Sequence, residues 1–148
     1  MAADGRLCLQ ERTYTPMTLL VTGGAGFIGG NFVLDWIAGG KEPLVNLDKL
    51  TYAGNLETLA SVREHPHHHF VQGDIGDREL VSKLMAEHKP RAVLNFAAES
   101  HVDNSIKDCA PFIHTNILGT VSLLDLALKH EVEKFIHIST FQILSSKF

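Results

Sequence analysis

The eight residues Thr22-Gly-Gly-Ala-Gly-Phe-Ile-Gly29 decide the fold of this chain. They lie between Thr18–Thr22, a run typical of a buried strand, and Phe27–Ala38, whose apolar residues have helical spacing. In a G-x-x-G-x-x-G turn, the glycines permit a tight bend, close approach of the backbone to a pyrophosphate and close helix–strand packing. Here they are Gly23, Gly26 and Gly29. Because the following helix would also direct free N–H groups and its positive dipole end at phosphates, the stretch predicts dinucleotide binding.

Short apolar runs alternate with longer amphipathic segments from this turn onward. Further strands are predicted at Leu44–Asp48, around Phe70-Val71, at Ala92–Phe96 and at Lys134–Ile138. Four helices are predicted between them. The first ends at Gly39-Gly40 and the second occupies 57–64; the third begins after the cap Asp77 and ends at about His88, and the fourth extends from Phe112 to about His130. Strands separated by helices imply right-handed crossovers. The predicted fold class is therefore α/β, a doubly wound, Rossmann-type parallel sheet that stops after about five strands.

The composition predicts one globular domain. The 148 residues carry 13 Lys and Arg against 17 Asp and Glu, a formal net charge of −4, and 45% of them are hydrophobic. With no long basic run and no unbroken apolar stretch, a nucleic-acid-binding surface and a membrane span are both disfavoured. The two cysteines, Cys8 and Cys109, are too few for a disulfide framework, which favours a cytoplasmic protein. We expect 1–16 to be a disordered leader, 17–140 the dinucleotide-binding domain and 141–148 a separate tail.

An acidic residue follows the glycine turn at the distance typical of dinucleotide-binding folds. Asp48 lies 19 residues after Gly29, at the predicted end of the second strand. A carboxylate there accepts hydrogen bonds from the adenosine ribose and repels a 2′-phosphate, by about 4 kcal/mol for unit charges about 4 Å apart at an effective dielectric near 20. Asp48 therefore predicts NAD rather than NADP. The alternative is that Asp48 only caps the following loop, while Lys49 offsets part of the repulsion.

The nine histidines include the cluster His65 and His67–His69, which raises the question of a metal site. Neighbouring histidines in one turn do not form a tetrahedral site without distant ligands, and no cysteine pair has metal-binding spacing. We therefore expect a solvated loop there, and no bound metal.

Three further stretches carry a resemblance to a known family. Asn46-Leu-Asp-Lys-Leu-Thr-Tyr-Ala-Gly-Asn55 resembles the adenosine-binding loop of dTDP-glucose 4,6-dehydratases, and Asn95–Asp103 and Pro111–Asn116 fit the same family. The glycine turn resembles the TGxxGxxG signature of extended short-chain dehydrogenases, the superfamily that contains these enzymes. The resemblance extends from about Met17 to Thr140. It implies NAD as the cofactor, dTDP-glucose as the substrate and, in the family, a homodimer; the sequence leaves the assembly of this chain open.

The resemblance also implies roles for individual residues. The cofactor-binding residues would be Gly23, Gly26, Phe27, Ile28 and Gly29 at the pyrophosphate turn; Asp48, Lys49, Leu50 and Thr51 around the ribose; Asp74 and Ile75 at the adenine edge; and Phe96, Ala97, Ala98, Glu99, Ser100 and Thr115 along the nicotinamide side. Ser100 and Thr140 would contact the substrate, and Thr140 would occupy the catalytic threonine position. Glu99 could equally face the substrate or cap the following helix.

The family's proton-transfer residues are missing from this chain. In the family, NAD takes a hydride from C4 of the glucosyl ring, water leaves across C5–C6, and the hydride returns to C6. A Tyr-x-x-x-Lys pair and an Asp–Glu pair carry the proton transfers. Here neither Tyr14 nor Tyr52 is followed by Lys at the fourth position, and Phe141 and Gln142 follow Thr140. We therefore expect a truncated product that lacks the substrate domain and is inactive by itself.

Two alternatives remain open. One is another NAD-dependent nucleotide-sugar enzyme of the superfamily, such as a 4-epimerase, which would share the glycine turn. The other is a non-catalytic dinucleotide-binding module, which would need no Tyr–Lys pair. An Asp–Glu pair after the threonine would separate the dehydratase from the epimerase, whereas micromolar NAD binding by this chain alone would favour the module.

Overall fold

Five parallel strands form one sheet in the order β3-β2-β1-β4-β5. The computed structural model describes residues 18–100 and 108–139. Its strands are β1 (Leu19–Thr22), β2 (Leu44–Asp48), β3 (His68–Gln72), β4 (Ala92–Asn95) and β5 (Lys134–His137). The chain builds outward from β1 to β3 and then crosses back to place β4 on the other side of β1. This reversal confirms the predicted doubly wound topology and creates a switch point beside β1.

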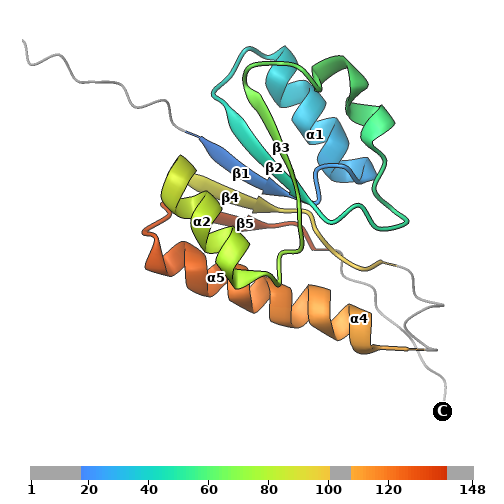
Figure 1. Cartoon of the computed structure of the whole chain (residues 1–148), viewed down its shortest axis with the longest axis vertical. Helices are drawn as coiled ribbons and strands as arrows, with labels where there is room; N and C mark the ends of the chain where they lie inside the picture. Colours follow the sequence, from blue (N-terminus) through green and yellow to red (C-terminus); the bar gives the residue numbers. More distant parts are fainter. Residues whose placement is uncertain (1–17, 101–107, 140–148) are drawn as a thin grey trace, which may run out of the picture.

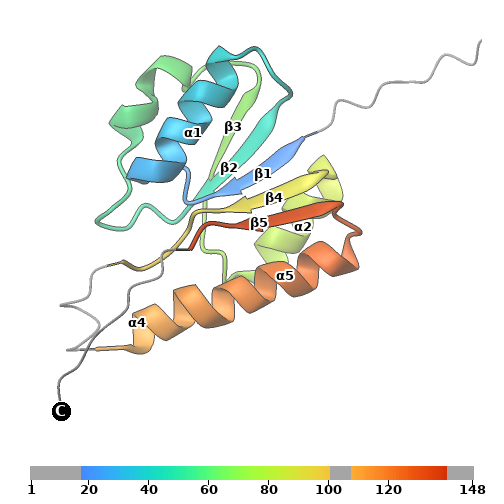
Figure 2. The ribbon, with the colours of Figure 1, turned by 180° about the vertical axis from the view of Figure 1, so that it is seen from behind.

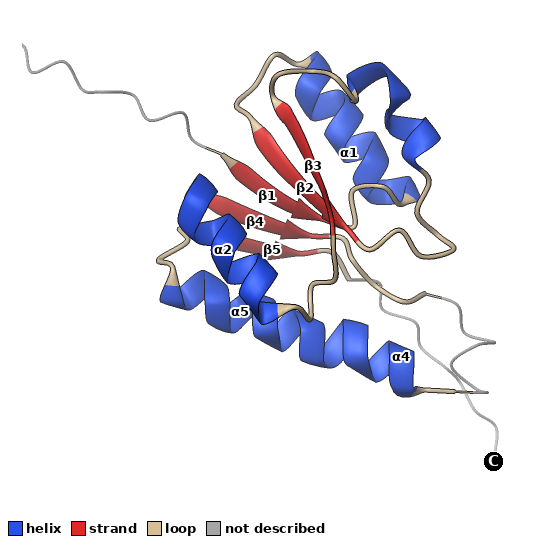
Figure 3. Cartoon of the chain, viewed as in Figure 1, coloured by secondary structure: helices blue, strands red, loops and turns tan. Residues whose placement is uncertain are grey.

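Helices cover both faces of the sheet. They are α1 (Phe27–Ala38), the 3₁₀ helix η1 (Leu56–Val62), α2 (Arg78–His88), α4 (Ala110–Phe112), the π-helical segment η2 (Ile113–Gly119) and α5 (Thr120–Lys129). Figures 1 and 2 show α1 on one side of the sheet, and α2 with α5 on the other. Helices and sheet therefore form the three layers expected when both faces of a parallel sheet are apolar (Figure 3).

The alternation of side chains along β1 separates two hydrophobic cores. Leu19 and Val21 belong to the core under α1, whereas Leu20 belongs to the core under α2 and α5. All four residues of β1 are buried, as expected for the central strand of a sheet covered on both faces. The α1 residues Val33 and Ile37, one turn apart, are buried in the first core, which confirms the apolar helix face read from the sequence.

The helix predicted at Phe112–His130 is observed as one run over Ala110–Lys129, with the π-helical segment in its first half. By length and composition alone, this run could cross a membrane. Its inner face is, however, part of the domain core, because Leu123, Leu126 and Ala127 are buried against the sheet and α2. Arg78 of α2 also forms an ion pair with Asp125. We therefore describe the run as a sheet-covering helix.

The histidine cluster corrects one expectation. His68 and His69 lie in β3, not in a solvated loop, and His68 is only 8% exposed. The carbonyl of Val62 can only accept, so His68 Nδ1, 3.0 Å away, carries the proton, and Nε2 accepts from Asn46 Nδ2 at 3.3 Å. With both ring nitrogens bonded, the neutral imidazole is tolerated inside the sheet. Among the described residues, no group of three metal-ligating side chains could hold a metal ion.

This buried histidine predicts a loss of stability in acid. Burial lowers the pKa of His68, and the nearby His65 and His69 lower it further, against the Val62 hydrogen bond, which raises it. Below about pH 6.5, His68 is therefore protonated more readily in the unfolded chain than in the folded chain. The free energy of unfolding should fall as the pH drops below that value. One such proton contributes at most about 1.4 kcal/mol per pH unit.

Urea denaturation of wild type and His68→Gln between pH 5 and 8 measures this contribution. We expect a shallower acid slope for His68→Gln. The matched control is Glu64→Gln, which introduces the same side chain at an exposed position before the strand. Equal slopes for wild type and His68→Gln would contradict the assignment.

Candidate functional site

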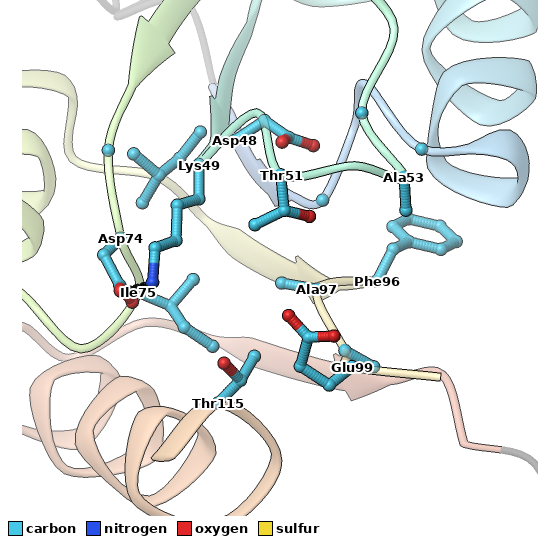
Figure 4. Close-up of a pocket in the computed structure, with 16 residues that line it drawn as sticks. Asp48, Lys49, Thr51, Ala53, Asp74, Ile75, Phe96, Ala97, Glu99 and Thr115 are labelled. Carbon is cyan, nitrogen blue, oxygen red and sulfur yellow. Dashed lines mark ion pairs between the residues drawn. The ribbon is translucent and has the colours of Figure 1, made fainter. Parts of the chain in front are cut away.

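A pocket opens at the carboxyl ends of β1, β2, β3 and β4, beside the switch in strand order (Figure 4). This is where ligands bind in open parallel sheets. It holds about 560 Å³ of empty space, counting the part that is open to solvent. The lining residues are Gly23, Gly26, Leu47, Asp48, Lys49, Thr51, Ala53, Gly54, Gly73, Asp74, Ile75, Phe96, Ala97, Ala98, Glu99 and Thr115.

Backbone hydrogen bonds bring the four strand ends to one edge. The N–H groups of the residues that follow β1, β3 and β4 each donate to a carbonyl of a neighbouring strand at 2.9 Å. These bonds are Gly23 to Leu47, Gly73 to Asp48 and Phe96 to Thr22. The sheet ladder therefore extends one residue beyond each of these strands, so segments far apart in the sequence line one pocket.

The glycine turn has no room for side chains at Gly23 and Gly29. Gly23 has φ +73°, and a Cβ there would lie 2.5 Å from the backbone nitrogen of Ala97. A Cβ at Gly29 would lie 2.3 Å from the carbonyl oxygen of Gly23. No side chain caps the N-terminus of α1, whose first residue is Phe27. The first-turn N–H groups of α1 thus keep no intrahelical acceptor and are available to an anion at the turn.

The Asp48 carboxylate accepts backbone hydrogen bonds from its own domain and also lines the pocket. Its Oδ2 accepts from the N–H of Ala25 and its Oδ1 from the N–H of Leu50, each at 2.8 Å, and the residue is 8% exposed. The loop-capping alternative therefore describes a real contact of this carboxylate. Since each carboxylate oxygen has two lone pairs, the same group retains acceptor capacity towards the pocket that it lines.

An ion pair closes the side of the pocket formed by β2 and β3. Lys49 Nζ lies 2.7 Å from Asp74 Oδ2, and Figure 4 shows the lysine side chain reaching down to that carboxylate. Burial alone would raise the pKa of Asp74, but hydrogen bonds from Lys49 and the Gly76 N–H, with the charges of Lys49 and His114, hold that pKa below its ordinary value. Asp74 is therefore an ionised acceptor at neutral pH.

Lys49 is the only cationic side chain among the lining residues, and it is paired with Asp74. The carboxylates of Asp48, Asp74 and Glu99 also line the pocket. A phosphate group bound here would therefore depend on backbone N–H groups of the glycine turn, at the start of α1, rather than on a basic side chain.

On the opposite wall, the side-chain amide of Asn116 holds the backbone of Glu99 through two hydrogen bonds. Asn116 Oδ1 accepts from the N–H of Glu99 at 2.8 Å, and Asn116 Nδ2 donates to the Glu99 carbonyl at 2.9 Å. The Glu99 carboxylate in turn accepts from the Tyr52 hydroxyl at 3.0 Å. Figure 4 shows Glu99 and Thr115 on the side of the pocket that faces Thr51.

Most of the residues named from the sequence come together here. The predicted residues that line the pocket are Gly23, Gly26, Asp48, Lys49, Thr51, Asp74, Ile75, Phe96, Ala97, Ala98, Glu99 and Thr115. Those outside the lining are Phe27, Ile28, Gly29, Leu50 and Ser100. Phe27 and Ile28 are exposed in the first turn of α1, so only their backbone groups are directed by the turn. Thr140, the leader and the tail lie outside the described residues.

Several residues that line the pocket or hold its walls were not named as site residues from the sequence. They are the lining residues Leu47, Ala53, Gly54 and Gly73, together with Tyr52 and Asn116, which hold the walls. Gly73 and Leu47 could have been found from the ends of the predicted strands, because ligands in such sheets contact these ends. The pairing of Asn116 with Glu99 spans 17 residues and joins a helix to a loop, and it has no signal in the local pattern.

Comparison with known proteins gives consistent results. The family model described as GDP-mannose 4,6 dehydratase matches residues 20–143. A dTDP-glucose 4,6-dehydratase from Xanthomonas campestris pv. campestris (strain B100) is 53% identical over 135 residues, which cover 85% of this chain and 38% of that protein. The chain thus spans about two fifths of the length of the curated relatives it matches.

Two solved structures extend the comparison to the fold. A dTDP-glucose 4,6-dehydratase from Streptomyces venezuelae, with NAD and TYD bound, has a TM-score of 0.78 and 44% identity, covering 82% of this chain and 38% of that one. A UDP-glucose 4-epimerase from Thermus thermophilus, in complex with NAD, has a TM-score of 0.70 and 35% identity, covering 80% of this chain and 36% of that one.

Proposed function

The chain belongs to the GDP-mannose 4,6-dehydratase family, and we propose that it is the NAD-binding part of a dTDP-glucose 4,6-dehydratase. The observation that carries this proposal is the pocket itself, because a glycine turn with no room for a side chain at Gly23, an uncapped helix N-terminus and a strand-end carboxylate meet at the switch point. The dehydratase is favoured over the epimerase by identities of 53% and 44% against 35%.

The residues of the pocket fit NAD. Gly23 and Gly26 line the pocket, so a pyrophosphate there would lie close to their backbone, and the first turn of α1 would donate to it. Asp48 would accept from the ribose hydroxyls, and Asp74 would accept from the amino edge of the adenine. Thr115 and Ala97 would line the nicotinamide side. When bound, NAD supplies a hydride acceptor for oxidation of the sugar.

The sugar-nucleotide would approach from the ends of β4 and β5. We propose that Ser100, which is exposed just beyond Glu99, contacts it, and that Thr140 does so as the catalytic threonine. The chain's own residues supply positioning at this edge and no Tyr-x-x-x-Lys pair. We therefore expect the 148-residue chain, mixed with NAD and dTDP-glucose, to yield no 4-keto product, and measurable turnover would refute this.

A chimera separates the dehydratase from the alternatives. Residues 17–140 of this chain would replace the matching segment of the Xanthomonas relative, and the product would be assayed for NADH binding and for 4-keto sugar formation from dTDP-glucose. Activity of the chimera supports the proposal. A chimera that binds NADH but forms no 4-keto sugar would leave the dinucleotide-binding module as the better description, and a folded chimera that binds no NADH would overturn the cofactor assignment.

We also propose that the domain assembles with a second copy through the outer face of η2 and α5. Exposed apolar side chains repeat there every three or four residues: Ile113, Ile117, Val121, Leu124 and Leu128. Leu128, the last residue of this row, is 81% exposed. Sedimentation equilibrium tests this assembly directly, since a chain that stays monomeric at tens of micromolar would contradict it.

A cytoplasmic location completes the proposal, supported by the small number of cysteines.

A further inference from the structure

A side-chain hydrogen bond joins the two long walls of the pocket. The loop after β2 supplies Thr51, Ala53 and Gly54 to the lining, and the segment after β4 supplies Phe96 through Glu99. Tyr52 stands in the middle of the first set, and its hydroxyl donates to Glu99 Oε2 in the second at 3.0 Å. The bond therefore spans the pocket from one wall to the other.

Glu99 is a firm anchor for this contact. Both its N–H and its carbonyl are bonded to the side chain of Asn116, on the π-helical segment next to Thr115. Glu99 is half-buried, and its backbone is held by a helical run that packs in the core. Tyr52, by contrast, belongs to a loop and is 59% exposed. Movement at this contact is thus expected on the Tyr52 side.

Hydrogen bonds fix the Tyr52 loop at both of its ends. At its start, Leu50 donates to Asp48, and at its end, the N–H of Asn55 donates to the carbonyl of Ala25 at 2.9 Å. Between these points, the Gly54 N–H donates within the loop to the Thr51 carbonyl at 3.0 Å. The hydroxyl of Tyr52 thus provides a bond from the middle of the loop across the pocket.

We propose that Tyr52 is a positioning residue whose hydroxyl, bonded to Glu99, clasps the 49–55 loop against the segment after β4 and slows release of the bound dinucleotide. The inference rests on the proposed function for its ligand, but the clasp itself exists in the free chain. A cofactor that is regenerated in every cycle benefits from slow release, and the clasp supplies it without touching the reacting atoms. It gives Tyr52 a role distinct from that of a catalytic base.

Two measurements on the full chain test the clasp. Hydrogen exchange of the free chain reports on the loop without any cofactor, and Tyr52→Phe should speed exchange of the Gly54 amide while leaving β1 amides unchanged. Displacement of bound NADH by excess NAD, followed by fluorescence, gives the release rate. We expect Tyr52→Phe to raise that rate about three- to tenfold, the loss of one hydrogen bond to a charged acceptor in a partly exposed position.

A double-mutant cycle separates the bond from general damage. Glu99→Ala should raise the release rate in the otherwise wild-type chain but add little in the Tyr52→Phe background. Glu64→Ala, which removes an exposed carboxylate elsewhere, is the control. Additive effects in the cycle, or unchanged exchange and release in Tyr52→Phe, would overturn the clasp. Failure of wild type to bind NADH would instead count against the proposed function, with the exchange result still deciding whether the clasp exists.

Discussion

Replacing Gly23 by alanine is expected to abolish measurable NADH binding and to destabilise the domain. The φ of +73° at this position costs a residue with a Cβ about 1–2 kcal/mol. The new Cβ would also lie 2.5 Å from the backbone nitrogen of Ala97, an overpacked contact that adds about 1–3 kcal/mol because no flexible side chain can move away. Relief of this contact pushes the pocket wall at Ala97 away from its place, so the binding surface itself is distorted.

Gly40 offers a matched control for this substitution. It too has a positive φ, +61°, but nothing lies within 4 Å of a Cβ placed there, and it follows α1 far from the pocket. Gly40→Ala should therefore lower the free energy of unfolding only by the cost of a positive φ, and it should bind NADH like wild type. Urea denaturation and NADH titration of both variants check the prediction. Binding by Gly23→Ala within a few-fold of wild type would show that the turn is not a phosphate cradle.

Asp48→Asn is expected to weaken NAD binding about tenfold to a hundredfold and to narrow the preference for NAD over NADP. The charged acceptor for the ribose is lost, a change worth about 1.5–3 kcal/mol. The amide would also turn an NH₂ group towards the N–H of Ala25 or Leu50, both of which donate to Asp48. Removing the negative charge relieves its repulsion of a 2′-phosphate, so NADP should lose less affinity than NAD or gain some.

Calorimetric titration of NAD and NADP into wild type, Asp48→Asn and Asp35→Asn measures both effects. Asp35 is an exposed carboxylate on α1, so its replacement changes the net charge equally without touching the pocket. We expect Asp35→Asn to match wild type for both nucleotides. If Asp48→Asn kept the NAD affinity and the ratio of wild type, the carboxylate would act only as the cap of its loop.

The buried histidine shows where local pattern fails. A run of three histidines reads as a polar turn, and yet His68 lies inside a parallel sheet because Val62 and Asn46 satisfy both ring nitrogens. These partners lie six and 22 residues away. Burial of a polar group depends on such partners, and a window of sequence around the histidines does not contain both of them.

Local patterns in the chain predicted most of the strands and helices, the glycine turn and the carboxylate at the end of β2. They did so because periodicity, capping residues and glycines act within a few residues along the chain. The three-dimensional fold was needed to show that Tyr52 bonds to Glu99, that Asn116 holds Glu99 and that Lys49 pairs with Asp74. These contacts join elements 17 to 47 residues apart, or neighbouring strand ends, and their geometry is fixed by the order and register of the strands rather than by the residues beside them.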